Sequence, residues 1–473
     1  RLHQVCNGFL KTDSGQYYGF KHNPKLSELL RILDEATGKS IIWVTYVYNI
    51  EEIKNKLILE ADKYKDRLVS LVSKLTQFNS FIGQEKEIAY FIKEELIKIG
   101  LEVRTEDVDH ELIKKRKEYI PMPENTSYKD RPNVYGTLQG KGSGKDLYLF
   151  GHTDVVPVDE NTTWKYPPFS GEIVDNRIYG RGSADMKGGV GVAIVTLEIL
   201  KNLNINLKGN VTGQFVIEEE AGGNGTLYAA LQNEFTSNGA CIMLEPTGSH
   251  QIMVSNRGAQ YFRITVPGTE GGTEYHREID SAIDNAYIVI GAIKKFSDYR
   301  ESTVKHPLYE HETTKVPTAV GRIMSGAWPS TIPGEAVLEG TIECLPGEDI
   351  NEVVKEFEIF INKEISKVEW FKSNKIKFET FGLFFESGIT NPDHNFIKIL
   401  SNSTIATNNQ KPIIIGGGGS DLRLPVNINK CPTVLFGPGG GPIHSVDEWV
   451  STNELLKMLK VCLLTAIDWC ELS

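Results

Sequence analysis

Residues 147–158 read Leu-Tyr-Leu-Phe-Gly-His-Thr-Asp-Val-Val-Pro-Val, an apolar run that ends in a histidine and an aspartate two positions apart. The apolar run predicts a buried strand, and residues two apart on an extended chain lie on the same face. Asp154 can therefore accept the second ring N–H of His152, as a metal-bound histidine requires to fix its orientation. Taken alone, the stretch also fits an ordinary hydrogen-bonded histidine at the end of a strand.

Apolar runs that read as strands alternate with helical stretches along much of the chain. The predicted strands are 146–150, 210–217, 240–244, 411–415 and 433–436. The predicted helices are two within 50–100, of which the second stops at Gly100, then 188–203, and one from Asn453 to the end. This alternation predicts an α/β fold with a mostly parallel sheet covered by helices.

The pattern changes between about residues 256 and 378. Strands at 259–266 and 337–344 and helices at 281–296 and 350–365 predict an α+β insert. The remaining sequence divides into residues 52–255 and 379–473, which together form the α/β domain, and an appended segment, 1–51. A chain of 473 residues exceeds the ~250–300 beyond which single cores stop growing, so several domains are expected.

Composition narrows the class of protein. The formal net charge of −11 argues against a general nucleic-acid or anionic-membrane surface, so small molecules or peptides are the expected partners. The six cysteines lack the density and spacing of a disulfide framework and predict free thiols in a reducing compartment. No apolar stretch reaches the ~18 residues of a membrane span, and no secretory leader is recognised. We therefore expect a cytoplasmic protein.

A glycine-rich segment carries the next candidate ligand. Residues 179–189 read Tyr-Gly-Arg-Gly-Ser-Ala-Asp-Met-Lys-Gly-Gly and lead into the helix predicted at 188–203. Glycines allow backbone conformations that other residues avoid, so the turn can aim the carboxylate of Asp185 outward. For this stretch alone, the alternative is that Asp185 is the N-cap of the helix.

Three adjacent carboxylates, Glu218, Glu219 and Glu220, follow the strand predicted at 210–217 and run into a pair of glycines. Adjacent carboxylates repel one another, so we expect a cation to compensate them. A solvated acidic loop is the alternative, but the apolar residues immediately before the triplet predict that its base is buried.

Two more candidates stand at comparable places. Glu245 ends the strand predicted at 240–244, and His444 follows the loop Gly-Pro-Gly-Gly-Gly-Pro-Ile at 437–443. An ordinary loop histidine is the alternative for His444. Together the clusters offer two histidines and several carboxylates but no thiolate, which suits a hydrolytic site for two divalent ions, zinc, cobalt or manganese.

The order of these motifs resembles the dinuclear-zinc metallopeptidase family of acetylornithine deacetylase, succinyl-diaminopimelate desuccinylase and carboxypeptidase G. The resemblance covers about residues 52–473 and rests on His-x-Asp, Gly-Arg-Gly-x-x-Asp-Met-Lys-Gly-Gly, Glu-Glu-x-Gly-Gly, Glu-Pro and Gly-Pro-Gly with a later histidine. It implies a zinc-peptidase domain with an inserted lid and dimerisation domain, and hence a homodimer.

The resemblance also implies roles for the clustered residues. Asp185 would bridge two zinc ions, one also held by His152 and Glu245, the other by Glu220 and His444. Glu219, the first of the pair before Gly-Gly, would be the general base, and Asp154 would support catalysis behind His152. The peptide bond between Asp185 and Met186 is expected to be cis, as in similar enzymes.

Within the insert, His276 stands where relatives have an oxyanion donor supplied across the dimer. Arg257 and Arg423 are the candidates for gripping a substrate carboxylate, since a guanidinium can pair with one through two hydrogen bonds. Each could equally belong to a structural ion pair. Asp280, Ile283 and Ser330 depart from the residues usual in the family.

The first 50 residues contain Leu-His-Gln-Val-Cys-Asn-Gly-Phe at 2–9, Asn-Pro-Lys-Leu at 23–26 and Gly-Lys-Ser-Ile-Ile-Trp-Val at 38–44. These stretches resemble a short piece from the second motor lobe of Swi/Snf-type DNA helicases. Gly38-Lys39-Ser40 does not complete a phosphate-binding P-loop, because Leu33 stands where the motif needs its first glycine. We expect an appended fragment without motor activity, a helix followed by one apolar strand at 41–44.

The sequence therefore predicts a metal-dependent amidohydrolase that removes an acetyl, succinyl or formyl group from an amino acid or short peptide. A dipeptidase or aminoacylase of the same family is the nearest alternative. A non-catalytic peptide-binding protein on this fold and a DNA-associated protein defined by residues 1–51 are further alternatives.

Overall fold

The computed structural model describes residues 9–11, 17–19, 39–122 and 126–473, which fall into two compact units, Arg1–Glu60 and Ala61–Ser473. In the first unit, strands β1 (Phe9–Lys11) and β2 (Tyr17–Gly19) pair antiparallel. Helix α3 (Lys39–Lys63) begins here, so the strand expected at 41–44 is wrong. A short apolar run fits a strand or a helix equally well by periodicity alone. The rest of the helicase-like resemblance lies outside the described residues.

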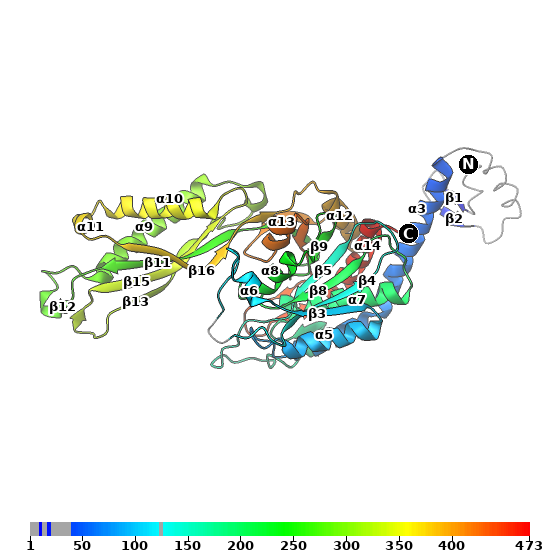
Figure 1. Cartoon of the computed structure of the whole chain (residues 1–473), viewed down its shortest axis with the longest axis horizontal. Helices are drawn as coiled ribbons and strands as arrows, with labels where there is room; N and C mark the ends of the chain where they lie inside the picture. The colour runs from blue at the N-terminus through cyan, green and yellow to red at the C-terminus, as the bar shows by residue number, and fades with distance from the viewer. Residues whose placement is uncertain (1–8, 12–16, 20–38, 123–125) are drawn as a thin grey trace, which may run out of the picture. The chain divides into compact units, whose positions relative to one another are not determined.

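A nine-stranded sheet forms the centre of the second unit (Figure 1). Its order is β17-β10-β19-β9-β5-β8-β4-β3, and β18 pairs with β10. The strands are β3 (Glu102–Asp107), β4 (Pro132–Leu138), β5 (Leu147–His152), β8 (Val211–Val216), β9 (Ala240–Met243), β10 (Gln251–Asn256), β17 (Gly388–Ile389), β18 (Ile413–Gly417) and β19 (Thr433–Leu435). The central ladder β19-β9-β5-β8 is parallel, as predicted, whereas the pairs β3–β4, β4–β8, β10–β19 and β10–β17 are antiparallel.

Helices cover this sheet, and their apolar faces explain where they lie. They are α4 (Lys65–Thr76), α5 (Lys86–Ile99), α6 (His110–Ile113), α7 (Gly188–Asn202), α8 (Asn224–Leu231), α12 (Asn395–Asn408), α13 (Arg423–Asn429) and α14 (Thr452–Cys470). Helix α7 is apolar on nearly all sides and is buried between α4, α14 and β5. A Cβ on its Gly189 would meet the carbonyl oxygen of Leu244 at 2.2 Å, so only glycine permits this close packing.

A smaller antiparallel sheet brings together the loops that contain Asp185 and His444. Its strands are β6 (Glu172–Val174), β7 (Arg177–Tyr179), β20 (Gly440–Gly441) and β21 (Trp449–Ser451). Strand β7 leads into the segment that contains Asp185, and β21 follows the loop that contains His444. Because β7 pairs with β21, these two loops lie side by side.

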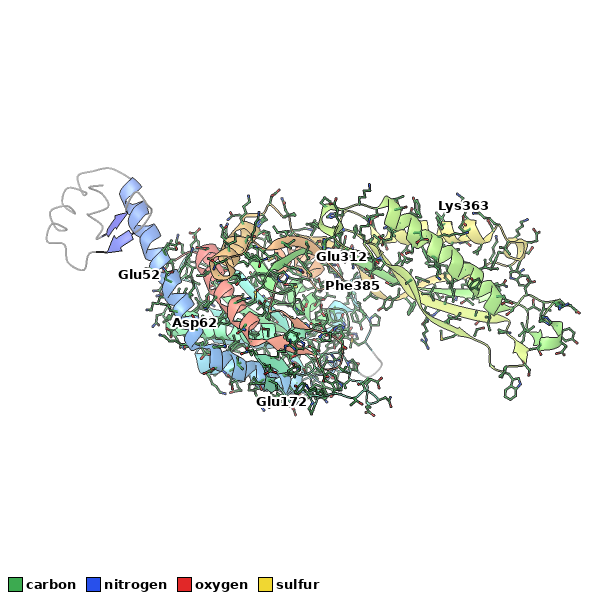
Figure 2. All side chains as sticks on the ribbon, turned by 180° about the vertical axis from the view of Figure 1, so that it is seen from behind. Glu52, Asp62, Glu172, Glu312, Lys363 and Phe385 are labelled. Carbon is green, nitrogen blue, oxygen red and sulfur yellow. The ribbon has the colours of Figure 1, made fainter. Side chains whose placement is uncertain are left out.

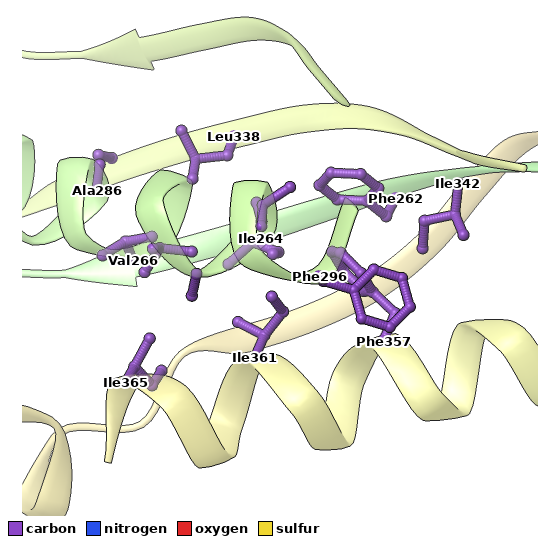
Figure 3. Close-up of a cluster of buried hydrophobic side chains, with 14 of the residues drawn as sticks. Phe262, Ile264, Val266, Ala286, Phe296, Leu338, Ile342, Phe357, Ile361 and Ile365 are labelled. Carbon is purple, nitrogen blue, oxygen red and sulfur yellow. The ribbon is translucent and has the colours of Figure 1, made fainter. Parts of the chain in front are cut away.

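The predicted insert is a separate antiparallel sheet in the order β13-β15-β11-β16, covered on one face by two helices. The elements are β11 (Gly258–Pro267), α9 (Ala282–Thr303), β13 (Thr318–Ser325), β15 (Glu335–Cys344), α10 (Ile350–Ile365) and β16 (Lys377–Phe385). Phenylalanines from the sheet and both helices, Phe262, Phe296 and Phe357, meet in its core (Figure 3). Strand β16 completes this sheet and ends at Phe385, seven residues beyond the end of the insert expected from the sequence.

Figure 2 shows Glu312 and Phe385 where the inserted domain meets the rest of the second unit, and Lys363 on α10. The ring of Phe385 stacks on the guanidinium of Arg423, with Cζ 3.7 Å from the ring centroid. Among the described residues, five cysteines are free and buried, and no helix is both long and apolar enough to span a membrane.

Candidate active site

The parallel ladder brings the predicted ligands to one edge of the large sheet. His152 ends β5, Glu218–Glu220 follow β8, and Glu245 follows β9. These three strands are neighbours, so the residues beyond their carboxyl ends meet, as is usual for ligand sites in α/β folds. Asp185 and His444 reach the same place from the paired strands β7 and β21.

The clustered side chains form two groups that share one carboxylate. His152, Asp185 and Glu245 form the first group, and Asp185, Glu220 and His444 form the second. Within each group, one nitrogen or oxygen atom per residue lies within 4.8 Å of the others. His152 and Asp185 are buried, whereas His444 is exposed, so the second group opens toward solvent.

The donor chemistry of these groups fits two divalent cations. Five carboxylates and imidazoles without a thiolate suit zinc, cobalt or manganese. Burial raises the pKa of Glu219 and of Glu245 well above the ordinary value, and neighbouring carboxylates raise both further. So many acids in one buried place repel one another, and positive charge is what relieves the repulsion.

Neighbouring charges also shift the pKa values of the two histidines and of Asp185. Burial works against the charged form of His152, but the carboxylates of Asp154 and Asp185 raise its pKa well above the ordinary value. Contacts with Asp185 and Glu220 raise the pKa of His444 to about 10. Burial opposes ionisation of Asp185, yet both imidazoles hold its pKa below the usual range.

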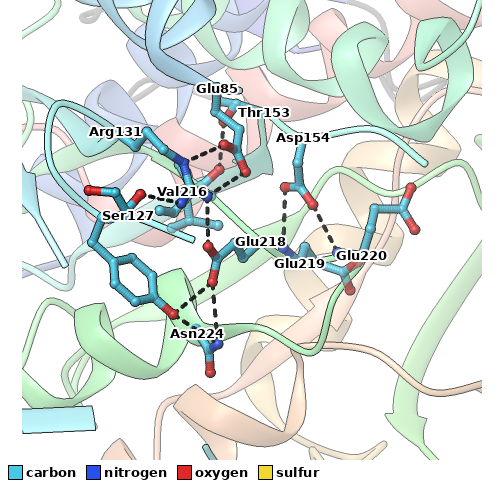
Figure 4. Close-up of polar contacts among 12 residues, drawn as sticks. Glu85, Ser127, Arg131, Thr153, Asp154, Val216, Glu218, Glu219, Glu220 and Asn224 are labelled. Atoms are coloured by element: carbon cyan, nitrogen blue, oxygen red, sulfur yellow. Dashed lines mark hydrogen bonds and ion pairs between the residues drawn. The ribbon is translucent and has the colours of Figure 1, made fainter. Parts of the chain in front are cut away.

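Asp154 contacts the ring of His152 through its main-chain oxygen and not, as expected, through its carboxylate. Nδ1 of His152 lies 3.0 Å from the main-chain oxygen of Asp154 and 3.6 Å from its carboxylate, so the carbonyl orients the ring. The carboxylate instead accepts the backbone N–H groups of Glu219 and Glu220, at 3.2 and 3.0 Å (Figure 4). Asp154 therefore ties the strand of one ligand to the turn that carries two other site residues.

Glu448 supports Asp185 in a comparable way. Its buried carboxylate accepts the backbone N–H groups of Ala184 and Asp185, at 3.1 and 3.2 Å, and pairs with Arg181 at 2.7 Å. It lies in the same loop as His444, so one segment supplies a candidate ligand and fixes the backbone of another. The peptide bond between Asp185 and Met186 is cis, as expected.

Arg257 and Arg423, the two candidates for binding a substrate carboxylate, both contact other groups of the chain. Arg257 lies 3.9 Å from Glu312 and 3.8 Å from Glu343, and it donates to the carbonyl oxygen of Thr314. Arg423 is 2% exposed; it pairs with Asp421 and donates to the carbonyl oxygens of Ser420 and Gly222. Because Gly222 follows Glu219 and Glu220, Arg423 braces the same turn.

His276 is exposed at the end of the short helix η2 (Thr273–Tyr275), next to strand β12 (Gly271–Gly272) at the tip of the inserted domain (Figure 1). Its Nδ1 lies 3.2 Å from the carbonyl oxygen of Thr273. It belongs to neither ligand group of this chain.

The supports of the site were not predicted from the sequence. They include Glu448, which lies in the same loop as His444, and Arg131, whose segment contains no recognisable motif. Only for Glu448 was a signal present, because it stands four residues after His444 in an otherwise glycine-rich loop.

A mostly parallel sheet covered by helices, with two groups of acids and histidines at one edge, is an arrangement that suits a metallohydrolase. The model of peptidase family M20/M25/M40 matches residues 148–468, and the chain belongs to this family of hydrolases that act on amide bonds.

Two curated relatives have different substrates in their names. N-formyl-4-amino-5-aminomethyl-2-methylpyrimidine deformylase of Halalkalibacterium halodurans is 26% identical over 88% of this chain and 97% of its own. Succinyl-diaminopimelate desuccinylase of a Bradyrhizobium species is 26% identical over 70% of this chain and 84% of its own.

Solved structures share the fold. Human carnosine dipeptidase 1 superposes with a TM-score of 0.67 at 16% identity, covering 88% of this chain and 99% of its own. A dinuclear metal-binding peptidase of the family from Bacillus subtilis gives a TM-score of 0.60 at 18% identity, covering 86% of this chain and 99% of its own.

Proposed function

We propose that this hydrolase removes a small acyl group, formyl, acetyl or succinyl, from the nitrogen of an amino acid or a related amine. The observation that carries the proposal is the pair of ligand groups sharing Asp185, with Glu219 next to the ligand Glu220 on the same turn. The names of the two curated relatives, a deformylase and a desuccinylase, support acyl removal from a small molecule.

The proposed roles follow from where the side chains lie. His152 and Glu245 would hold one cation, Glu220 and His444 the other, and Asp185 both. Such ions, when bound, supply Lewis acidity and lower the pKa of water. Zinc is the proposed ion, with cobalt or manganese as alternatives.

Glu219 is the proposed general base. It takes a proton from the attacking water and delivers it to the nitrogen of the leaving amine. Glu219 is partly buried and lies among the carboxylates of Asp421 and Glu245.

A substrate screen tests this proposal. Zinc-loaded protein is incubated with N-formyl, N-acetyl and N-succinyl amino acids and with unblocked dipeptides, and release of the amine is measured. We expect cleavage in one of the acyl series and little in the dipeptides. Cleavage of dipeptides alone would instead favour the dipeptidase alternative.

We also propose a homodimer through the inserted domain. Strand β13 is at the edge of its sheet and α9 packs beside it, and both expose large apolar side chains, Ile323 and Tyr287. An exposed edge strand is a ready site for pairing with another chain. In such a dimer, His276 of one subunit would serve the site of the other.

A further inference from the structure

A buried charged cluster lies behind the turn that carries Glu219 and Glu220 (Figure 4). Arg131 donates to both carboxylate oxygens of Glu85, at 2.7 and 3.0 Å. Its Nη2 also lies 2.6 Å from Oε1 of Glu218. The side chains of Glu85 and Glu218 are completely buried, and that of Arg131 is 5% exposed.

The second oxygen of Glu218 is also occupied by donors of the chain. Oε2 accepts the hydroxyl of Tyr128 at 3.0 Å and the amide of Asn224 at 3.2 Å. Glu218 belongs to neither ligand group, and its carboxylate points away from Glu219 and Glu220 (Figure 4). The cation that compensates this first glutamate of the triplet is therefore Arg131.

The backbone of Glu218 explains why its anchoring matters. Neighbours on a regular strand point to opposite faces, so Glu219 and Glu220 can both face the site only if the chain turns before them. Glu218 makes that turn with a φ of +61°, in the left-handed region that residues with a side chain seldom occupy. Its carbonyl oxygen accepts the N–H of Gly223 at 2.8 Å, which closes the turn.

We propose that Glu218, held by Arg131, is a positioning residue that sets the directions of both Glu219 and Glu220. The inference rests on the proposed function, in which these two neighbours are base and ligand. Arg131 contacts both Glu85 and Glu218, but only Glu218 belongs to the turn, so the guanidinium acts on the turn through Glu218 alone.

A matched pair of substitutions tests the proposal. Glu218→Gln and Glu85→Gln each neutralise one buried carboxylate on the same guanidinium, but only Glu218 belongs to the turn. Zinc affinity is measured by competition with a chromophoric chelator, and kcat and KM with the acyl substrate that the wild type cleaves.

We expect Glu218→Gln to weaken binding of the zinc ion held by Glu220 and to lower kcat, each about 10- to 100-fold, with KM nearly unchanged. Glu85→Gln should alter these quantities by less than about threefold, although both variants lose thermal stability. Equal losses in the two variants, or unchanged zinc affinity and kcat in Glu218→Gln, would overturn the proposal.

A milder pair decides the question if Glu218→Gln does not fold. Tyr128→Phe removes one donor to Glu218, whereas Tyr148→Phe removes a hydroxyl on β5 that is hydrogen-bonded to Thr236. We expect weaker zinc binding only in Tyr128→Phe, and equal behaviour of the pair would contradict the proposal. Zinc competition needs no substrate, so an enzyme that cleaves none of the acyl compounds refutes the proposed function and leaves this test intact.

Discussion

At the scale of single residues, Glu219 and Glu220 are neighbours with different proposed roles. Glu219→Gln should lower kcat by about 10²- to 10⁴-fold, because proton transfer to and from the base is lost, while both zinc ions remain bound. Glu220→Gln is the matched variant and should lose one ion. Metal content is measured by mass spectrometry of the dialysed proteins. Loss of zinc from Glu219→Gln with zinc retained in Glu220→Gln would mean that base and ligand are exchanged.

Glu448 allows a second residue-scale prediction, because its carboxylate holds the backbone of Asp185, the residue shared by both ligand groups. Glu448→Gln should weaken binding of both zinc ions about 10- to 100-fold. Glu454→Gln is the control. Glu454 lies in the same C-terminal part of the chain, and its carboxylate accepts the backbone N–H of Ser249 and pairs with Lys457. Equal zinc affinities of the two variants, measured by chelator competition, would show that Glu448 does not support the site.

The candidate metal ligands were easier to predict from the sequence than the residues that hold them in place. His152, Asp185, Glu220, Glu245 and His444 stand in short motifs, and the structure brings all five together. Arg131 lies in an ordinary segment 87 positions before Glu218, so only the fold reveals their contact. The hydrogen bonds from the turn to the carboxylate of Asp154 depend on backbone direction, which residue type alone does not specify.

At the scale of helices and strands, buried parallel strands were the easiest to predict. Strands β5, β8 and β9 are buried along their whole length and are largely apolar, although β8 also contains Thr212 and Gln214. The apolar residues at 41–44 gave the same signal but belong to α3. Strand β16 extends beyond the expected end of the insert at 378; it pairs with β11, more than a hundred residues earlier in the sequence, and no local signal marks that pairing.

The edge formed by β13 and α9 gives the prediction at this scale. Ile323→Glu or Tyr287→Glu should convert the proposed dimer to a monomer, because a buried charge without a partner is costly. Ile359→Glu is the control, since Ile359 is equally apolar and 69% exposed but lies on α10. Mass is measured by light scattering after size-exclusion chromatography. A dimer that survives both edge substitutions would place the interface elsewhere.

At the scale of the whole molecule, the ligands come from segments between residues 152 and 444, so bound ions would tie these segments together only in the folded state. Ions that bind the folded chain alone stabilise it by about 2.7 kcal/mol at 100 times the Kd. Chelation should therefore lower the melting temperature, and zinc should restore it. The variant Asp185→Asn should show much less zinc-dependent stabilisation. A wild type whose melting temperature is unaffected by chelation and zinc would contradict this prediction.

A crystal structure of the zinc-loaded protein, with anomalous scattering recorded at the zinc absorption edge, tests the shared role of Asp185 most directly. We expect two anomalous peaks on either side of the Asp185 carboxylate, one also contacted by His152 and Glu245, the other by Glu220 and His444. A single peak, or peaks that do not contact Asp185, would contradict the two-ion site.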